Sequence, residues 1–145
     1  MLLVNPRPLE AADAGAMLLQ APISVACGWP SPAQDYYDGP ISLDSALIKD
    51  HAATFIVRAS GSSMRGAGIE SGDELLVDRS LTPRDGDVVV AVLDGELTAK
   101  RLHLTDHGVV LRAESDDYPD ITVPELSELR VWGVVTYVIH HLRTP

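Results

Sequence analysis

From residue 54 to the C-terminus, short segments rich in branched apolar residues alternate with turns that contain glycine or aspartate. The predicted strands are TFIVRAS, DELLVDRS, GDVVVAVL, ELTAKRLHL, VVLRAE and LRVWGVVTYVIHHL. The third is almost continuously apolar, which predicts burial on both faces. Asp94 and Gly95 follow it as a tight hairpin, because both residues tolerate a positive φ. About six strands at such short spacing indicate a mainly β fold.

The first 40 residues have a different texture, because they hold six of the ten prolines. Proline at that density disrupts helices and hydrogen-bonded ladders. We therefore expect an extended, proline-rich N-terminal arm over residues 1–40 and a β-rich domain over residues 41–145. At the start of that domain, Ser42 is the predicted N-cap of a short helix within SLDSALIKDH.

Charge and length exclude several classes of protein. A formal net charge of −10 repels phosphate, so we expect no direct nucleic-acid binding by the surface as a whole. The single cysteine, Cys27, can form neither an internal disulfide nor a CxxC site, and we expect no metal and no cofactor. No apolar run is long enough to span a bilayer. AGAMLLQAPISVAC loosely matches a lipoprotein signal, but Glu10, Asp13 and Pro22 argue against it, so a cytoplasmic protein without membrane contact is expected.

One lysine stands in line with apolar residues. In ELTAKRLHL the alternation of a strand places Thr98, Lys100, Leu102 and Leu104 on one face. If that face is turned to the core, desolvation disfavours the ammonium, and the neutral amine can act as a general base. The alternative is a lysine that extends from the strand edge to water. Alternation alone leaves both interpretations open.

The segment RASGSSMRGAG places three serines within four positions of one another, beside glycines. A serine hydroxyl becomes a nucleophile only when a base takes its proton, and lysine is one known base. GSSMR fails the G-x-S-x-G pattern, since Arg65 stands where the second glycine is required. The pattern alone therefore leaves a polar turn and a nucleophile as alternatives.

Taken together, these segments resemble a known family. SGSSM after an apolar strand, followed by SGDELLVD and GDVVVAVLDGELTAKRL, is similar to the self-cleaving domain shared by LexA repressors and UmuD mutagenesis proteins. These proteins belong with the Ser-Lys peptidases, which include bacterial signal peptidase. The resemblance implies a LexA/signal-peptidase-like β-rich catalytic domain. It also implies that Ser63, before Met64, is the nucleophile and that Lys100 is the base, since their separation matches the family spacing.

The N-terminal arm carries a second match. ACGWPSPAQDYY resembles the UmuD cut region, which implies self-cleavage between Cys27 and Gly28. The family also implies an oxyanion site made by the backbone N–H groups of Ser62 and Ser63. Many members have aspartate where this chain has Ser62, and this departure places a second hydroxyl beside the nucleophile.

The resemblance also implies partners. UmuD-like proteins are cut when RecA filaments on single-stranded DNA stimulate them in the SOS response to DNA damage. The shortened form is a homodimer that joins a Y-family, UmuC-like polymerase in error-prone translesion synthesis. Dimer contacts are expected along VWGVVTYVIHHL, which exposes an apolar edge if it is unpaired. Two other functions stay open: a trans-acting Ser-Lys peptidase, and a β-rich interaction module that has lost cleavage.

Overall fold

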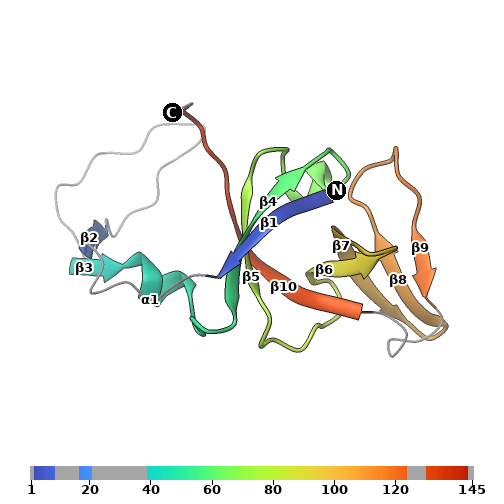
Figure 1. The fold of residues 1–145 in the computed structure, drawn as a ribbon, viewed down its shortest axis with the longest axis horizontal. Coiled ribbons are helices and arrows are strands. Elements are labelled where there is room, and N and C mark those ends of the chain that lie inside the picture. Colours follow the sequence, from blue (N-terminus) through green and yellow to red (C-terminus); the bar gives the residue numbers. More distant parts are fainter. Residues whose placement is uncertain (1, 9–16, 21–38, 124–129, 144–145) are drawn as a thin grey trace, which may run out of the picture. The chain divides into compact units, whose positions relative to one another are not determined.

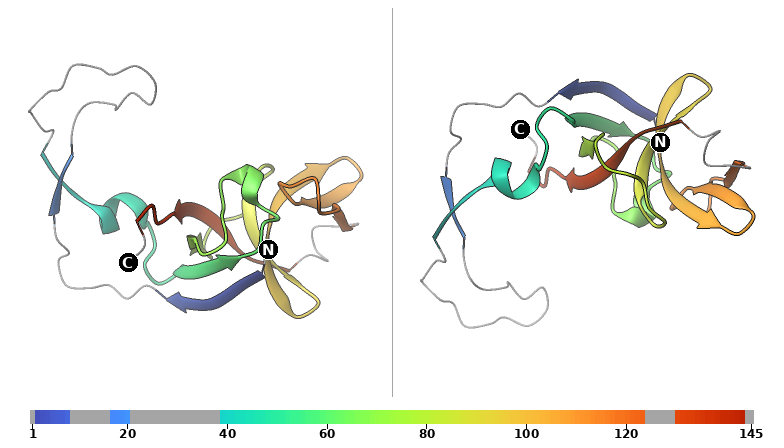
Figure 2. Two further views of the ribbon diagram at one scale, coloured as in Figure 1. Left: turned by 90° about the horizontal axis from the view of Figure 1, so that it is seen from above. Right: turned by 90° about the horizontal axis from the view of Figure 1, so that it is seen from below.

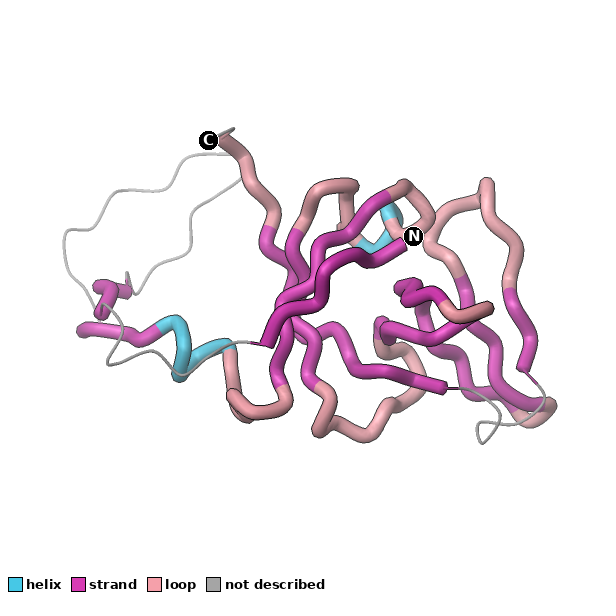
Figure 3. The backbone as a smooth tube through the Cα atoms, viewed as in Figure 1, coloured by secondary structure: helices cyan, strands magenta, loops and turns pink. Residues whose placement is uncertain are grey.

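We describe the protein from a computed structural model, which places residues 2–8, 17–20, 39–123 and 130–143. Its elements are β1 (Leu2–Pro8), β2 (Met17–Gln20), β3 (Gly39–Ser42), α1 (Leu43–Leu47), β4 (Thr54–Ser60), a 3-10 turn η1 (Arg65–Ala67), β5 (Glu74–Asp78), β6 (Val88–Leu93), β7 (Glu96–Thr105), β8 (Gly108–Arg112), β9 (Ile121–Val123) and β10 (Arg130–Ile139). Strands dominate this part of the chain (Figure 3), so the mainly β prediction is confirmed.

Two compact units divide the chain. One combines Met1–Glu10 with Asp50–Pro145, and the other spans Ala11–Lys49. In the smaller unit β2 pairs with β3 in antiparallel fashion, and α1 follows β3. The predicted N-cap is confirmed, since the Ser42 side chain accepts a hydrogen bond from the Ser45 amide at 3.4 Å.

The larger unit is built on one eight-stranded sheet with the order β1-β4-β5-β10-β6-β7-β8-β9. All six strands predicted from the pattern are present, and β10 runs between β5 and β6 (Figure 1). The sheet curls far enough that β1 also pairs with β7, through Leu2 and Thr98. The predicted hairpin is confirmed, because Asp94 and Gly95 have φ values of 50° and 79°.

The position of β10 differs from one expectation. The C-terminal strand would have offered an apolar edge if it were unpaired, but β10 is paired on both sides and lies inside the sheet. Its register shifts against β6 between Val131 and Gly133, and against β5 between Val135 and Tyr137. Such bulges bend a strand and increase its twist, which helps the sheet to curl.

The N-terminal strand β1 lies along the outer side of β4 (Figure 2). Leu2 pairs with Ser60, Leu3 with Ala59 and Val4 with Arg58. The register then shifts before Arg7, which pairs with Ile56. The proline-rich sequence did not predict this pairing.

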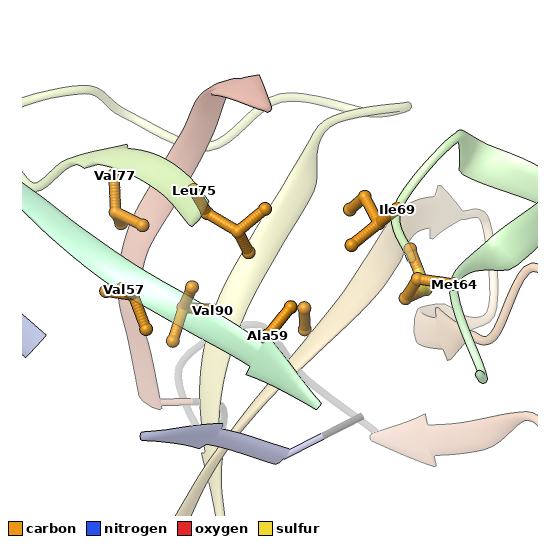
Figure 4. Close-up of a cluster of buried hydrophobic side chains, with 8 residues drawn as sticks. Val57, Ala59, Met64, Ile69, Leu75, Val77 and Val90 are labelled. Carbon is orange, nitrogen blue, oxygen red and sulfur yellow. The ribbon is translucent and has the colours of Figure 1, made fainter. Parts of the chain in front are cut away.

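Two clusters of buried side chains form the hydrophobic core. The first contains Val57, Ala59, Met64, Ile69, Leu75, Val77, Val90 and Ala99 (Figure 4). The second contains Val89, Ala91, Leu102, Val109, Leu111 and Val134. Val89, Val90 and Ala91 are consecutive and fully buried, so the prediction that this strand is covered on both faces is confirmed. Among the described residues, no helix has the length and apolar character needed to cross a membrane.

Candidate active site

The predicted nucleophile, Ser63, lies in the turn that follows β4. Gly61 adopts a φ of 93°, a left-handed conformation that glycine reaches without steric cost and that turns the chain sharply after the strand. The amide of Arg65 donates to the Ser62 carbonyl at 3.2 Å, which closes the turn on its other side. The Ser63 side chain is therefore directed inward, and Ser63 has 0% of its surface exposed, whereas Ser62 is half-buried.

Met64 anchors this turn to the core. Its side chain is fully buried in the first cluster, close to Ile69 (Figure 4). Its carbonyl accepts hydrogen bonds from the amides of Ala67 at 3.0 Å and Ile69 at 3.2 Å. A methionine next to the serine thus fixes the turn through both its side chain and its backbone.

A backbone contact from another part of the chain fixes the turn from a second side. The Gly66 amide donates to the carbonyl of Glu114, after β8, at 2.8 Å. A Cβ atom at Gly66 would lie 2.6 Å from that carbonyl oxygen, closer than real Cβ atoms come. Only glycine therefore permits this approach.

Lys100 comes to the same place from β7. It is only 7% exposed. Ala99 before it and Leu102, two residues after it, are both fully buried. A lysine that extends to water is therefore the wrong alternative for this position. The face that carries it begins at buried Thr98, although Leu104 at its far end is 41% exposed.

The two predicted catalytic side chains are brought together. Lys100 Nζ lies 3.4 Å from Ser63 Oγ, across a sequence separation of 37 residues. As an ammonium the lysine donates to the hydroxyl oxygen, and as a neutral amine it could accept the serine proton across the same contact. This distance is longer than a typical hydrogen bond, as is common for catalytic pairs without bound substrate. The geometry can support activation of a serine by a lysine.

Sequence reasoning missed one residue at this site. Lys100 Nζ lies 5.8 Å from the centre of the Tyr118 ring, within the range of a cation–π interaction. Tyr118 lies in the polar segment between β8 and β9, and β9 was not predicted. Nothing in the local pattern of that segment marks it as a neighbour of Lys100. Tyr118 and Gly66 also line an adjoining open pocket with Glu114, Asp116 and Asp120.

The predicted cut, Cys27–Gly28, lies outside the part of the chain that the structure describes. Within the described ranges, no group of three or more His, Cys, Asp or Glu side chains could hold a metal ion.

Comparisons with known proteins identify the family of this chain. A sequence profile of the Peptidase S24-like family matches residues 18–136. The chain is 44% identical to Protein ImpA of Salmonella typhimurium over 116 residues, which are 80% of this chain and 79% of that protein. It is 38% identical to Protein MucA of Escherichia coli over 118 residues, 81% of each chain.

A repressor is also similar. The chain is 35% identical to the LexA repressor of Magnetococcus marinus over 136 residues, which are 92% of this chain and 58% of the repressor. The family profile covers most of the chain, including both SGSSM and TAKRL. The resemblance predicted from those motifs is therefore confirmed, and this chain belongs to the Peptidase S24-like family.

Proposed function

We propose that this protein is a self-cleaving regulatory subunit of an error-prone translesion polymerase in the SOS response. The observation that carries the proposal is the buried contact of 3.4 Å between Lys100 Nζ and Ser63 Oγ. Charged groups are seldom buried without a specific partner. A lysine buried beside a serine hydroxyl therefore indicates a functional pair. The match of ACGWPSPAQDYY to the UmuD cut region supplies the substrate, the bond between Cys27 and Gly28.

The reaction runs in two stages. Ser63 Oγ forms a bond to the carbonyl carbon of Cys27 while its proton passes to the neutral amine of Lys100. Backbone N–H groups of Ser62 and Ser63 stabilise the oxyanion. The bond to Gly28 breaks as its nitrogen takes the proton from Lys100. Water then hydrolyses the ester, which releases the Cys27 carboxylate and restores Ser63.

Because the substrate is covalently linked to the site, the site needs little affinity for it. The arm is part of the same chain, so its effective concentration at the site is high. An extended, proline-rich segment is suited to lie in a cleft as an added strand. The shortened form, residues 28–145, would then form the homodimer and join a UmuC-like, Y-family polymerase. RecA filaments on single-stranded DNA would stimulate the cut, and the net charge of −10 agrees with a protein that meets DNA through partners.

The test is the intact mass of the purified protein after incubation, with and without RecA filaments on single-stranded DNA. Wild type is compared with Ser63→Ala and Lys100→Ala. We expect one new species that begins at Gly28 in the wild type alone, and faster formation of it with RecA. If the wild type stays whole under both conditions, self-cleavage is wrong and an interaction module is the better description.

A second assay separates self-cleavage from a trans-acting peptidase. An unrelated protein with an extended segment is added to the wild type, and both masses are followed. Self-cleavage predicts that only the chain itself is cut. Cutting of the added protein at a comparable rate would favour the general peptidase.

A further inference from the structure

The outer side of β4 is a strand-binding edge, and the chain covers it with its own N-terminus. The backbone of Ala59 forms its hydrogen bonds on the side of β4 that faces β5. Its amide donates to the Asp73 carbonyl at 2.8 Å, and its carbonyl accepts from the Gly72 amide at 2.8 Å. Successive residues of a strand turn these groups to opposite sides. The backbone groups of Arg58 and Ser60 therefore face β1, where their partners are Val4 and Leu2.

Residues 2–8 are the described segment that covers this edge. In the sheet order β1 is the terminal strand, and β4 follows it directly. Without β1, the amides and carbonyls of Arg58 and Ser60 would form an open edge, a template on which another extended chain can pair. The start of β1 also pairs with Thr98 on β7, so it joins the two strands that lead to Ser63 and Lys100.

The position of β1 in the sequence determines what cleavage would do to this edge. The strand belongs to the segment ahead of Cys27–Gly28, so the cut would separate it covalently from β4. A tethered strand has an effective concentration of the order of mM, whereas a released fragment at about 1 µM is about a thousand times more dilute.

We infer that cleavage turns the β4 edge into an open strand-binding site that accepts an extended peptide segment of a partner by β-augmentation. This inference rests on the proposed cleavage for its timing, but the edge itself exists in the uncut chain. The recognition is by backbone pairing at Arg58 and Ser60, so the ligand class is an extended peptide with free N–H groups at alternate residues. Residues 2–8 of this chain are the ligand that the structure contains.

The test uses the full chain with Ser63→Ala, which cannot cut itself under the proposed mechanism. Val4→Pro is added, because proline has no amide hydrogen to donate to the Arg58 carbonyl. Val4→Thr is the matched control, since threonine is β-branched and keeps its amide. Hydrogen exchange of single amides is followed by NMR. We expect exchange at Arg58 and Ser60 to become about tenfold faster or more with Val4→Pro, and that of Val57 and Ala59 to stay slow.

Rescue in trans completes the test. A synthetic peptide of residues 1–10 is added to the Val4→Pro protein, with a scrambled peptide as control. Renewed protection of Arg58 and Ser60 by the first peptide alone supports the site. Unchanged exchange in Val4→Pro, or no rescue at millimolar peptide, would overturn it. Because none of these proteins is cut, failure here leaves self-cleavage untouched, and failure of the mass assay leaves the edge untouched.

Discussion

Lys100 Nζ and Ser63 Oγ lie 3.4 Å apart in the interior of the protein, although 37 residues separate them in the sequence. The contact is set by elements on both sides. Met64 holds the serine turn in the core, and β7 carries the lysine between buried neighbours.

The two adjacent hydroxyls should differ in effect. Ser63 is buried against Lys100, whereas Ser62 is half-buried and contributes a carbonyl to the turn. We expect Ser63→Ala to abolish cleavage and Ser62→Ala to retain it, because the backbone at Ser62 is kept. Intact mass over time measures both. Loss of cleavage in Ser62→Ala, with Ser63→Ala still active, would reverse the assignment.

Removal of the lysine amine should remove the base. Lys100→Met keeps the length of the buried chain and eliminates the amine, so we expect the rate of cleavage to fall by about 10²–10⁴-fold. Lys49→Met, at an exposed position, is the control and should cleave as the wild type does. A Lys100→Met variant that cleaves at the wild-type rate would count against a lysine base.

Met64 should be needed for its volume. Its side chain is fully buried beside the serine, so Met64→Ala should lower the free energy of unfolding by about 2–5 kcal/mol. Met64→Leu conserves volume and should cost less than about 1.5 kcal/mol. Urea denaturation of both variants in a Ser63→Ala background measures the difference. Equal stability of the two would show that the side chain does not anchor the turn.

Gly66 should not tolerate a side chain. A Cβ atom would meet the Glu114 carbonyl oxygen at 2.6 Å, and a backbone atom cannot move aside as a side chain can. We expect Gly66→Ala to destabilise the fold by about 1–3 kcal/mol and to slow cleavage through displacement of Ser63. Gly68→Asn is the control, because its surroundings are open and asparagine tolerates the positive φ of 83°. Thermal unfolding that ranks the two variants in the opposite order would contradict this account.

Asp73 should stabilise the turn ahead of β5. It is 2% exposed, and its carboxylate accepts the Glu70 amide at 2.8 Å and contacts His140 Nδ1 at 2.5 Å. Asp73→Ala leaves these groups without an acceptor and should cost about 1–3 kcal/mol, whereas Asp73→Asn should cost less. Asp106→Ala, at an exposed position, should change stability by less than about 0.5 kcal/mol. Urea denaturation measures all three.

Much of the sheet could be predicted from local pattern. Alternating and continuous apolar runs gave β4 to β8 and β10, and Asp94-Gly95 gave the hairpin, because these features depend on neighbours in sequence. The place of β10 could not be predicted, since pairing with β5 and β6 depends on contacts far apart in the chain. β1 was missed because Pro6 and Pro8 argue against a ladder. At the edge of a sheet, however, only one side of the strand requires amides.

The candidate site, too, could be predicted only in part from local pattern. Local alternation placed Lys100 in line with Leu102 but could not decide between core and water. The pairing with Ser63 followed from the family resemblance, and the structure then brought the two side chains together. Tyr118 had no signal of either kind, because its approach to Lys100 depends on how a polar loop folds back over β7.

The central place of β10 has a consequence for synthesis of the protein. Among the described strands β10 is made after all the others, yet it alone connects the β4–β5 pair to the group from β6 to β9, apart from the single bridge of β1 to β7. Ser63 follows a strand of the first group and Lys100 lies in the second. A chain whose β10 has not yet left the ribosome therefore lacks the strand that aligns them. Under the proposed mechanism, self-cleavage would therefore have to wait until β10 has been made and has paired with β5 and β6.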